Sequence, residues 1–104
     1  MPSPQQLDAF THAFHEEAIS RLTGDPALVE RALQTLQRWH AQRGPSASDP
    51  YLHEWAELLR GNLSDLKAAV CAPGDRAATL RNVSPLGFVL GPAERMALRA
   101  QAHA

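Results

Sequence analysis

Cysteine, β-branched residues and aromatic residues are all scarce in this sequence. The 104 residues include one cysteine, Cys71, so neither an intramolecular disulfide nor a cysteine-based zinc site can form. Valine, isoleucine and threonine together number 9 against 18 alanines and 14 leucines, a balance that favours helix over strand. An all-β sandwich is therefore nearly excluded. We expect one compact domain over residues 1–104, held together by helix packing alone.

Long apolar runs and a secretory leader are also missing. No apolar stretch approaches the roughly 20 residues that cross a bilayer. The opening residues, MPSPQQLDAF, contain neither the basic nor the apolar region of a signal peptide. These absences predict a cytoplasmic protein with no membrane contact.

Proline, glycine and capping side chains divide the chain into short helices. Asp25-Pro26 and Asp49-Pro50 each place a capping side chain before a proline at the first helical position, and Asn62 and Asp75 are expected to cap two further helices. These signals predict an all-α bundle of five or six short helices. The predicted segments are a helical hairpin over 4–43 that turns at Gly24, a loop over 44–49, helices within 50–82, an apolar loop over 83–91 and a C-terminal helix over 92–102.

Apolar side chains at steps of three and four define the faces that these helices are expected to bury. The stripe of the first helix consists of Leu7, Phe10, Phe14, Ala18 and Leu22. The two tryptophans, Trp39 and Trp55, lie on the apolar faces of later helices. We expect both of them to pack into the same core.

The apolar loop over 83–91 has two interpretations. It holds five apolar side chains in nine residues bounded by proline and glycine, which is too short for a comfortable helix and too isolated for a sheet. One interpretation is a loop that closes the bundle, with Phe88 and Leu90 filling gaps between helices. The other is an exposed apolar patch that awaits a partner.

Residues that could carry chemistry form no recognisable site. His12, His15 and Glu16 are expected on the polar side of the first helix, in solvent, and HAFHE does not match a zinc motif. Cys71 is expected to be a buried, inert side chain at the end of an apolar helix edge. Motifs for acyl transfer, phosphate and dinucleotides are missing. The sequence therefore predicts no catalytic residue, no metal site and no cofactor.

Charge is uneven along the chain. Residues 49–75 carry five acidic and two basic side chains, whereas residues 76–104 carry one acidic side chain and four arginines, Arg76, Arg81, Arg95 and Arg99. Nucleic-acid binding normally needs a denser basic stripe than this. A regulator that touches phosphate through the arginine-rich segment is an alternative function, and a self-associating helical adaptor is another.

A set of short motifs resembles a group of small bacterial proteins. The motifs are Asp25-Pro26-Ala27-Leu28, Arg38-Trp39, Trp55, Leu58-Leu59, Leu80-Arg81, Ser84-Pro85-Leu86, Leu90 and Glu94-Arg95. Proteins with a C-terminal LRxxSPF…L…ER signature are similar, although Leu86 stands where phenylalanine is commoner. The resemblance implies an antitoxin-like protein, or a partner of a mobile-element enzyme, without catalytic activity.

These observations lead to one hypothesis about function. We expect a small cytoplasmic interaction protein that binds and restrains another protein through an apolar helix face or through the loop over 83–91. Arg81 and Glu94 flank that loop and are expected to clamp it with a charge-assisted hydrogen bond, while Ser84 turns the chain before Pro85. The predicted partner-binding residues are Arg81, Ser84, Leu86, Phe88, Val89, Leu90, Glu94 and Arg95. The oligomeric state cannot be read from the sequence.

Overall fold

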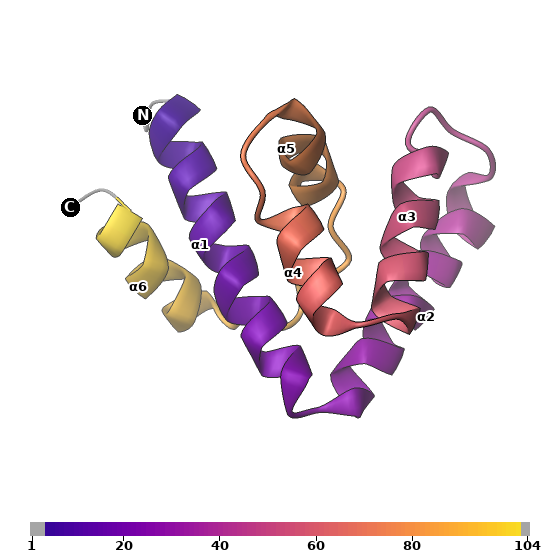
Figure 1. Cartoon of the computed structure of the whole chain (residues 1–104), viewed down its shortest axis with the longest axis horizontal. Helices are drawn as coiled ribbons and strands as arrows, with labels where there is room; N and C mark the ends of the chain where they lie inside the picture. Colours follow the sequence, from indigo (N-terminus) through magenta and orange to yellow (C-terminus); the bar gives the residue numbers. More distant parts are fainter. Residues whose placement is uncertain (1–3, 103–104) are drawn as a thin grey trace.

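The computed structural model describes residues 4–102, and for 4–7 and 102 the backbone alone. All regular structure in this range is helical, which confirms the predicted all-α class, and its outer dimensions are 38 × 31 × 24 Å. The helices are α1 (Pro4–Thr23), α2 (Pro26–Arg43), α3 (Asp49–Arg60), α4 (Leu63–Val70), α5 (Asp75–Asn82) and α6 (Pro92–Ala102) (Figure 1).

The helices begin largely where capping side chains predict. The Asp25 carboxylate accepts a hydrogen bond from the Ala27 N–H at 3.1 Å, and the Asn62 side chain accepts one from the Ser64 N–H at 2.7 Å. Each bond satisfies one of the N–H groups that a helix start leaves without an intrahelical partner. Both predicted caps are confirmed.

The predicted caps Asp49 and Asp75 are wrong by one residue. Asp49 is already helical, and its carboxylate reaches backward to accept from the Ser46 N–H and hydroxyl at 3.1 and 3.2 Å. Asp75 is the first residue of α5, and Gly74 precedes it with a φ of 102°, a backbone angle that favours glycine. An acidic side chain in the first turn still interacts favourably with the positive end of the helix dipole.

The helices α1 and α2 diverge in a V from the turn at residues 24 and 25, and α4 and α5 lie between the arms (Figure 1). The predicted hairpin thus turns where expected, and its two helices diverge from the turn. Besides contacting each other, the two helices have different neighbours, because α1 packs against α4, α5 and α6 and α2 packs against α3.

The core is centred on Trp55, whose side chain is fully buried. Its indole Nε1–H donates a 2.8 Å hydrogen bond to the Leu80 carbonyl, which joins α3 to α5. Trp39 is half-buried and packs against the same core, as predicted. Of the stripe on α1, Phe14, Ala18 and Leu22 are buried, and Phe10 packs at the edge. The side chain of Leu7 lies outside the described residues.

Candidate functional site

The loop over 83–91 lies largely inside the molecule. Leu86 and Leu90 are 0 and 3% exposed, and Pro85 is fully buried. Phe88 and Val89 are half-buried and pack against the core. The first interpretation of this loop, closure of the bundle, is therefore confirmed, and the loop presents no large exposed apolar patch.

The turn into this loop forms as the sequence predicts. The Ser84 hydroxyl oxygen accepts a hydrogen bond from the Leu86 N–H at 3.1 Å, across Pro85. The Phe88 ring lies under the guanidinium of Arg31 on α2, with 4.4 Å between the guanidinium carbon and the ring centroid. The loop thus contacts α2 through a cation–π pair at the edge of the core.

Arg81 is a buried structural residue, with 3% of its side chain exposed. Its Nη1 donates to the carbonyls of Val70 and Ala72 at 2.7 and 3.2 Å, and its Nη2 pairs with the Asp8 carboxylate at 3.0 Å. The predicted clamp between Arg81 and Glu94 is therefore wrong. Arg81 instead ties the end of α4 and the start of α1 to α5.

The clamp on the loop comes from Arg95. Its Nε donates to the Leu90 carbonyl at 3.2 Å, its Nη2 donates to the Gly87 carbonyl, and its guanidinium carbon lies 4.9 Å from the centroid of the Phe14 ring. Glu94 accepts from the Gly91 N–H at 3.3 Å and pairs with Arg21 on α1. The bond from Arg21 is the main cause that lowers the pKa of the Glu94 carboxyl.

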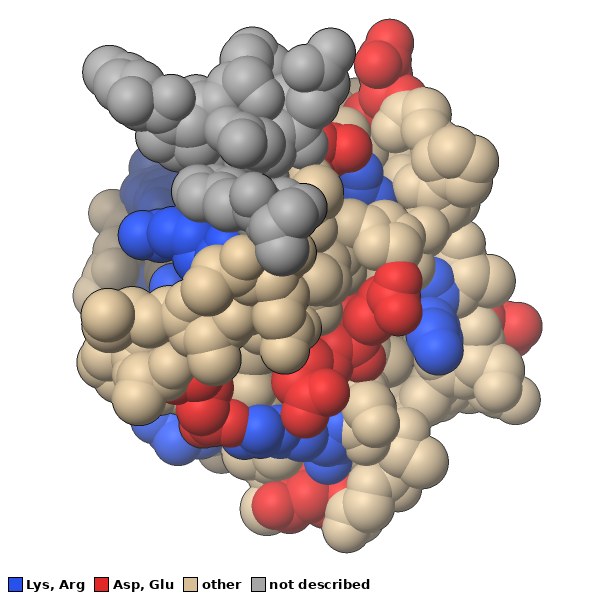
Figure 2. All heavy atoms as spheres, turned by 90° about the vertical axis from the view of Figure 1, so that its left-hand side faces the viewer, with Lys and Arg blue, Asp and Glu red and all other residues tan. Residues whose placement is uncertain are grey.

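The four arginines of the C-terminal segment do not share one exposed face. Arg81 is buried, and Arg76 on α5 pairs with Glu54 of α3. Arg95 and Arg99 on α6 lie over the Phe14 and Phe10 rings of α1. On the visible part of the face shown in Figure 2, basic and acidic side chains are interspersed.

His15 is buried, with 2% of the residue exposed, and the prediction that it lies in solvent is wrong. Its Nδ1 lies 2.8 Å from the Thr11 carbonyl, and its ring contacts Phe14 edge-on with 5.2 Å between centroids. Burial is the largest cause that lowers the pKa of His15 to about 4, so the ring is neutral at pH 7. His15 precedes Ala18 by three residues and Leu22 by seven, and this helical spacing is the feature of the sequence that indicates burial.

His12 and Glu16 pair at 2.9 Å on one face of α1, and the His12 Nε2 lies 2.9 Å from the Cys71 carbonyl oxygen. Cys71 is half-buried rather than fully buried, and desolvation raises the pKa of its thiol. No cluster of three metal-ligating side chains occurs within the described residues.

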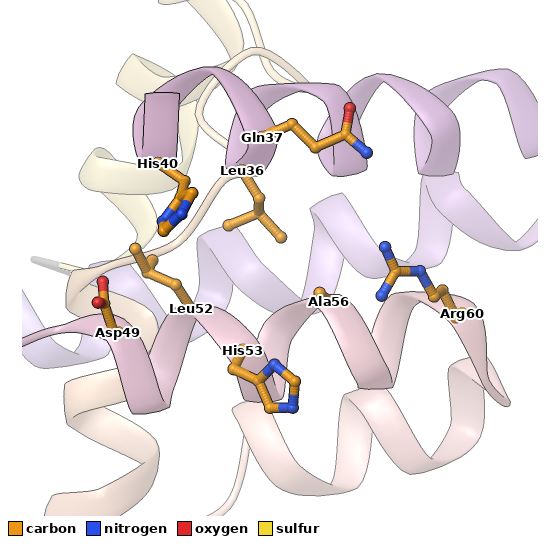
Figure 3. A pocket seen from close by; sticks show the side chains of 8 residues that line it. All are labelled: Leu36, Gln37, His40, Asp49, Leu52, His53, Ala56 and Arg60. Atoms are coloured by element: carbon orange, nitrogen blue, oxygen red, sulfur yellow. The ribbon is translucent and has the colours of Figure 1, made fainter. Parts of the chain in front are cut away.

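A groove of about 410 Å³ lies between α2 and α3, and we call it the α2–α3 groove. Its apolar residues are Leu36 of α2 and Leu52 and Ala56 of α3. Figure 3 shows Leu36 and Leu52 directed toward each other across the groove, with Asp49 near one end and Arg60 at the other. The remaining lining residues are Gln37, His40 and His53.

The sequence predicts that the apolar residues of this groove are buried, but it does not predict the groove itself. Leu36, Leu52 and Ala56 lie on apolar faces that the sequence assigns to the core. Leu36 is 7% exposed, whereas Leu52 and Ala56 are only half-buried. A small alanine on one wall leaves space beside the larger side chains, and every described residue that lines this space belongs to α2 or α3. The groove results from the way α2 and α3 pack against each other, which the periodicity of apolar residues does not predict.

Comparison of the chain with protein-family models, with curated proteins and with solved structures finds no match. Within the described residues, no helix has the length and apolar character needed to cross a membrane.

Proposed function

We propose that this protein is a small non-catalytic interaction module that binds and restrains a partner protein, in the manner of an antitoxin. The observation that carries the proposal is the α2–α3 groove, which combines an apolar interior with charged and polar side chains at its edges. Such a surface fits the apolar face of a partner helix, because one or two large side chains can enter while polar groups meet the rim.

The surroundings of the groove support this role. The two helices that form its walls have 18 and 12 residues, so the lining side chains are carried by regular helix. Side chains on helices are held more precisely than side chains on loops, which lowers the ordering cost of binding. The groove therefore supports a preformed docking site.

Charge at the ends of the groove favours one orientation of the partner. Asp49 lies toward one end and Arg60 lies at the other (Figure 3). A partner helix with a basic side chain near Asp49 and an acidic one near Arg60 is complementary to this arrangement. We therefore expect an amphipathic partner helix with charges of opposite sign at its two ends.

The alternative of a nucleic-acid-binding regulator receives less support. Binding to phosphates requires basic side chains on a common accessible surface. Arg81 is buried under α1 and α4, and Arg76 is engaged by Glu54. These two arginines therefore do not add to a basic surface shared with Arg95 and Arg99.

The test is affinity capture with the full chain as bait, repeated at high salt, with two arginine variants as comparisons. Ala56→Arg places a long charged side chain in the groove. Ala100→Arg adds the same side chain at an exposed position of α6, outside the groove. We expect wild type and Ala100→Arg to retain one common protein at high salt, and Ala56→Arg to lose it.

Two results would overturn the proposal. One is retention of the same protein by a folded Ala56→Arg variant, as judged by circular dichroism. The other is enrichment that disappears with nuclease or salt, which would favour the nucleic-acid alternative. Restraint is then tested by adding the chain to the purified captured protein, whose activity should fall in proportion to occupancy.

A further inference from the structure

His40 on α2 differs from the other histidines whose side chains the structure describes. The rings of His12, His15 and His53 each have a nitrogen close to an oxygen atom of the protein, at 2.9, 2.8 and 3.0 Å. Among the described residues, no hydrogen-bond partner or ion-pair partner contacts the ring of His40, which is exposed. The two nitrogens of this ring are therefore available to a group from another molecule.

The His40 ring lies at one end of the α2–α3 groove. Figure 3 shows it directed from α2 toward Leu52 and Asp49 of α3. The Asp49 carboxylate accepts hydrogen bonds from the N–H and the hydroxyl of Ser46 at 3.1 and 3.2 Å, and these bonds hold it in place. An imidazole on one wall and a carboxylate on the other thus border this end of the groove.

The remaining titratable and charged groups of the α3 wall lie elsewhere. Arg60 lies at the opposite end of the groove (Figure 3). His53 is directed away from α2 and pairs with Glu57 at 3.0 Å. The α3 side chain that determines the charge next to His40 is therefore Asp49.

The residues near His40 along the chain add little charge to this end of the groove. Arg43 lies over the Trp39 ring, with 5.3 Å between the guanidinium carbon and the ring centroid. Residues 44–48, which connect α2 to α3, have no titratable side chain. A change in the charge of His40 therefore changes the charge of this end directly.

We propose, on the basis of the role in partner binding proposed for the groove, that His40 and Asp49 together hold a basic side chain of the partner and that acid releases it. A neutral imidazole can accept a hydrogen bond from a lysine or an arginine, whereas an imidazolium cannot accept one and repels the basic group. Histidine side chains ordinarily change charge between pH 5 and pH 8. The affinity for the partner should therefore fall as the pH is lowered through this range.

The experiment measures the dissociation constant of the protein that wild type captures and Ala56→Arg does not, at about pH 7.5 and at about pH 5.5. His40→Gln keeps an acceptor and stays neutral, and His40→Lys stays charged at both pH values. His53→Gln is the matched control, because it removes a histidine of the same groove that is directed away from α2.

We expect the affinity of wild type and of His53→Gln to fall on acidification at least about fivefold further than the affinity of His40→Gln. The partner's own titratable groups act on all variants alike, so this difference is due to His40. At about pH 7.5, His40→Lys should bind at least about fivefold more weakly than wild type.

Two results would overturn the inference and leave the groove as a docking site. One is an equal pH response of folded wild type and folded His40→Gln, and the other is equal affinity of His40→Lys and wild type at about pH 7.5. Circular dichroism checks the fold at both pH values, and the comparison with His40→Lys decides if acid unfolds the chain. Capture of no protein, or of the same protein by Ala56→Arg, would refute the docking role itself and the role of His40 with it.

Discussion

The two ends of the molecule use their polar and apolar groups differently. At the end formed by α1, α4, α5 and the loop over 83–91, Arg81 reaches two carbonyls and one carboxylate, and Leu86 is sealed inside. At the α2–α3 end, apolar side chains line an open groove, and Leu52 and Ala56 remain half-buried. The first end holds the fold together, and the second has room for a partner. Four predictions test or sharpen this difference.

The largest effect is expected at the centre of the core, where Trp55 of α3 is bonded to α5. Trp55→Ala removes a fully buried ring and the indole donor that the Leu80 carbonyl accepts from. Substitutions of this kind cost about 4 kcal/mol. We expect the free energy of unfolding, measured by urea denaturation, to fall by that amount or the chain to lose its fold. A loss below about 1 kcal/mol would contradict the assignment of Trp55 as the core centre.

Arg81 and Asp8 form one ion pair but should differ strongly in their contribution to the free energy of unfolding. Arg81→Ala removes the donor to two carbonyls inside the protein and should cost about 3 kcal/mol. Asp8→Asn changes a side chain that is 62% exposed and should cost less than about 1 kcal/mol. Denaturant melts of both variants measure the difference. Equal losses would show that the surface carboxylate, rather than the carbonyls, anchors the arginine.

The stability of the end formed by α1, α4, α5 and the loop over 83–91 should also depend on pH, through His15 on α1. Burial lowers the pKa of His15 in the folded state from 6.5 to about 4. Between these two pH values, His15 therefore binds a proton in the unfolded chain but not in the folded chain. Stability is therefore complete above about pH 6.5 and falls as the pH is lowered toward 4. Linkage gives a loss of about 2 kcal/mol between pH 7 and pH 5.

The measurement is the free energy of unfolding at several pH values between 7 and 5, for wild type and for His15→Phe. This window lies above the ordinary pKa values of the carboxyl groups, so the histidine dominates. The variant should show a much flatter slope in this range. An identical slope in the two proteins would assign the effect to another histidine.

The smallest effects are expected from two substitutions that add volume, one at each end of the molecule. Ala18→Leu adds volume at a fully buried position on α1 and should destabilise by about 2 kcal/mol. Ala56→Leu adds the same volume in the α2–α3 groove and should change stability by less than about 0.5 kcal/mol. Thermal unfolding of the two variants tests this directly. A large loss for Ala56→Leu would show that the groove is already filled.

Local signals in the sequence predicted most of the fold. Asp25-Pro26 and Asn62 begin helices where expected, because capping depends on residues within one turn. The V between α1 and α2 could not be predicted, since it depends on which neighbour each apolar face meets.

The candidate sites were predicted less well than the fold. The apolar stripe drawn for the first helix leaves His15 on the polar side, yet its spacing from Ala18 and Leu22 places it on the buried face. The partner of Arg81 is Asp8, 73 residues away, and no periodicity links two such positions. The α2–α3 groove depends on how two helices approach each other, so apolar periodicity predicts only a core role for its leucines and alanine.

The most direct test of the central claim, that the open α2–α3 groove is the binding surface, is a calorimetric titration of the captured partner into three proteins. Wild type and Ala100→Arg should bind with the same dissociation constant, and Ala56→Arg should bind at least about tenfold more weakly, a difference of about 1.4 kcal/mol. Equal dissociation constants for all three folded proteins would contradict the claim and place the interface elsewhere on the molecule.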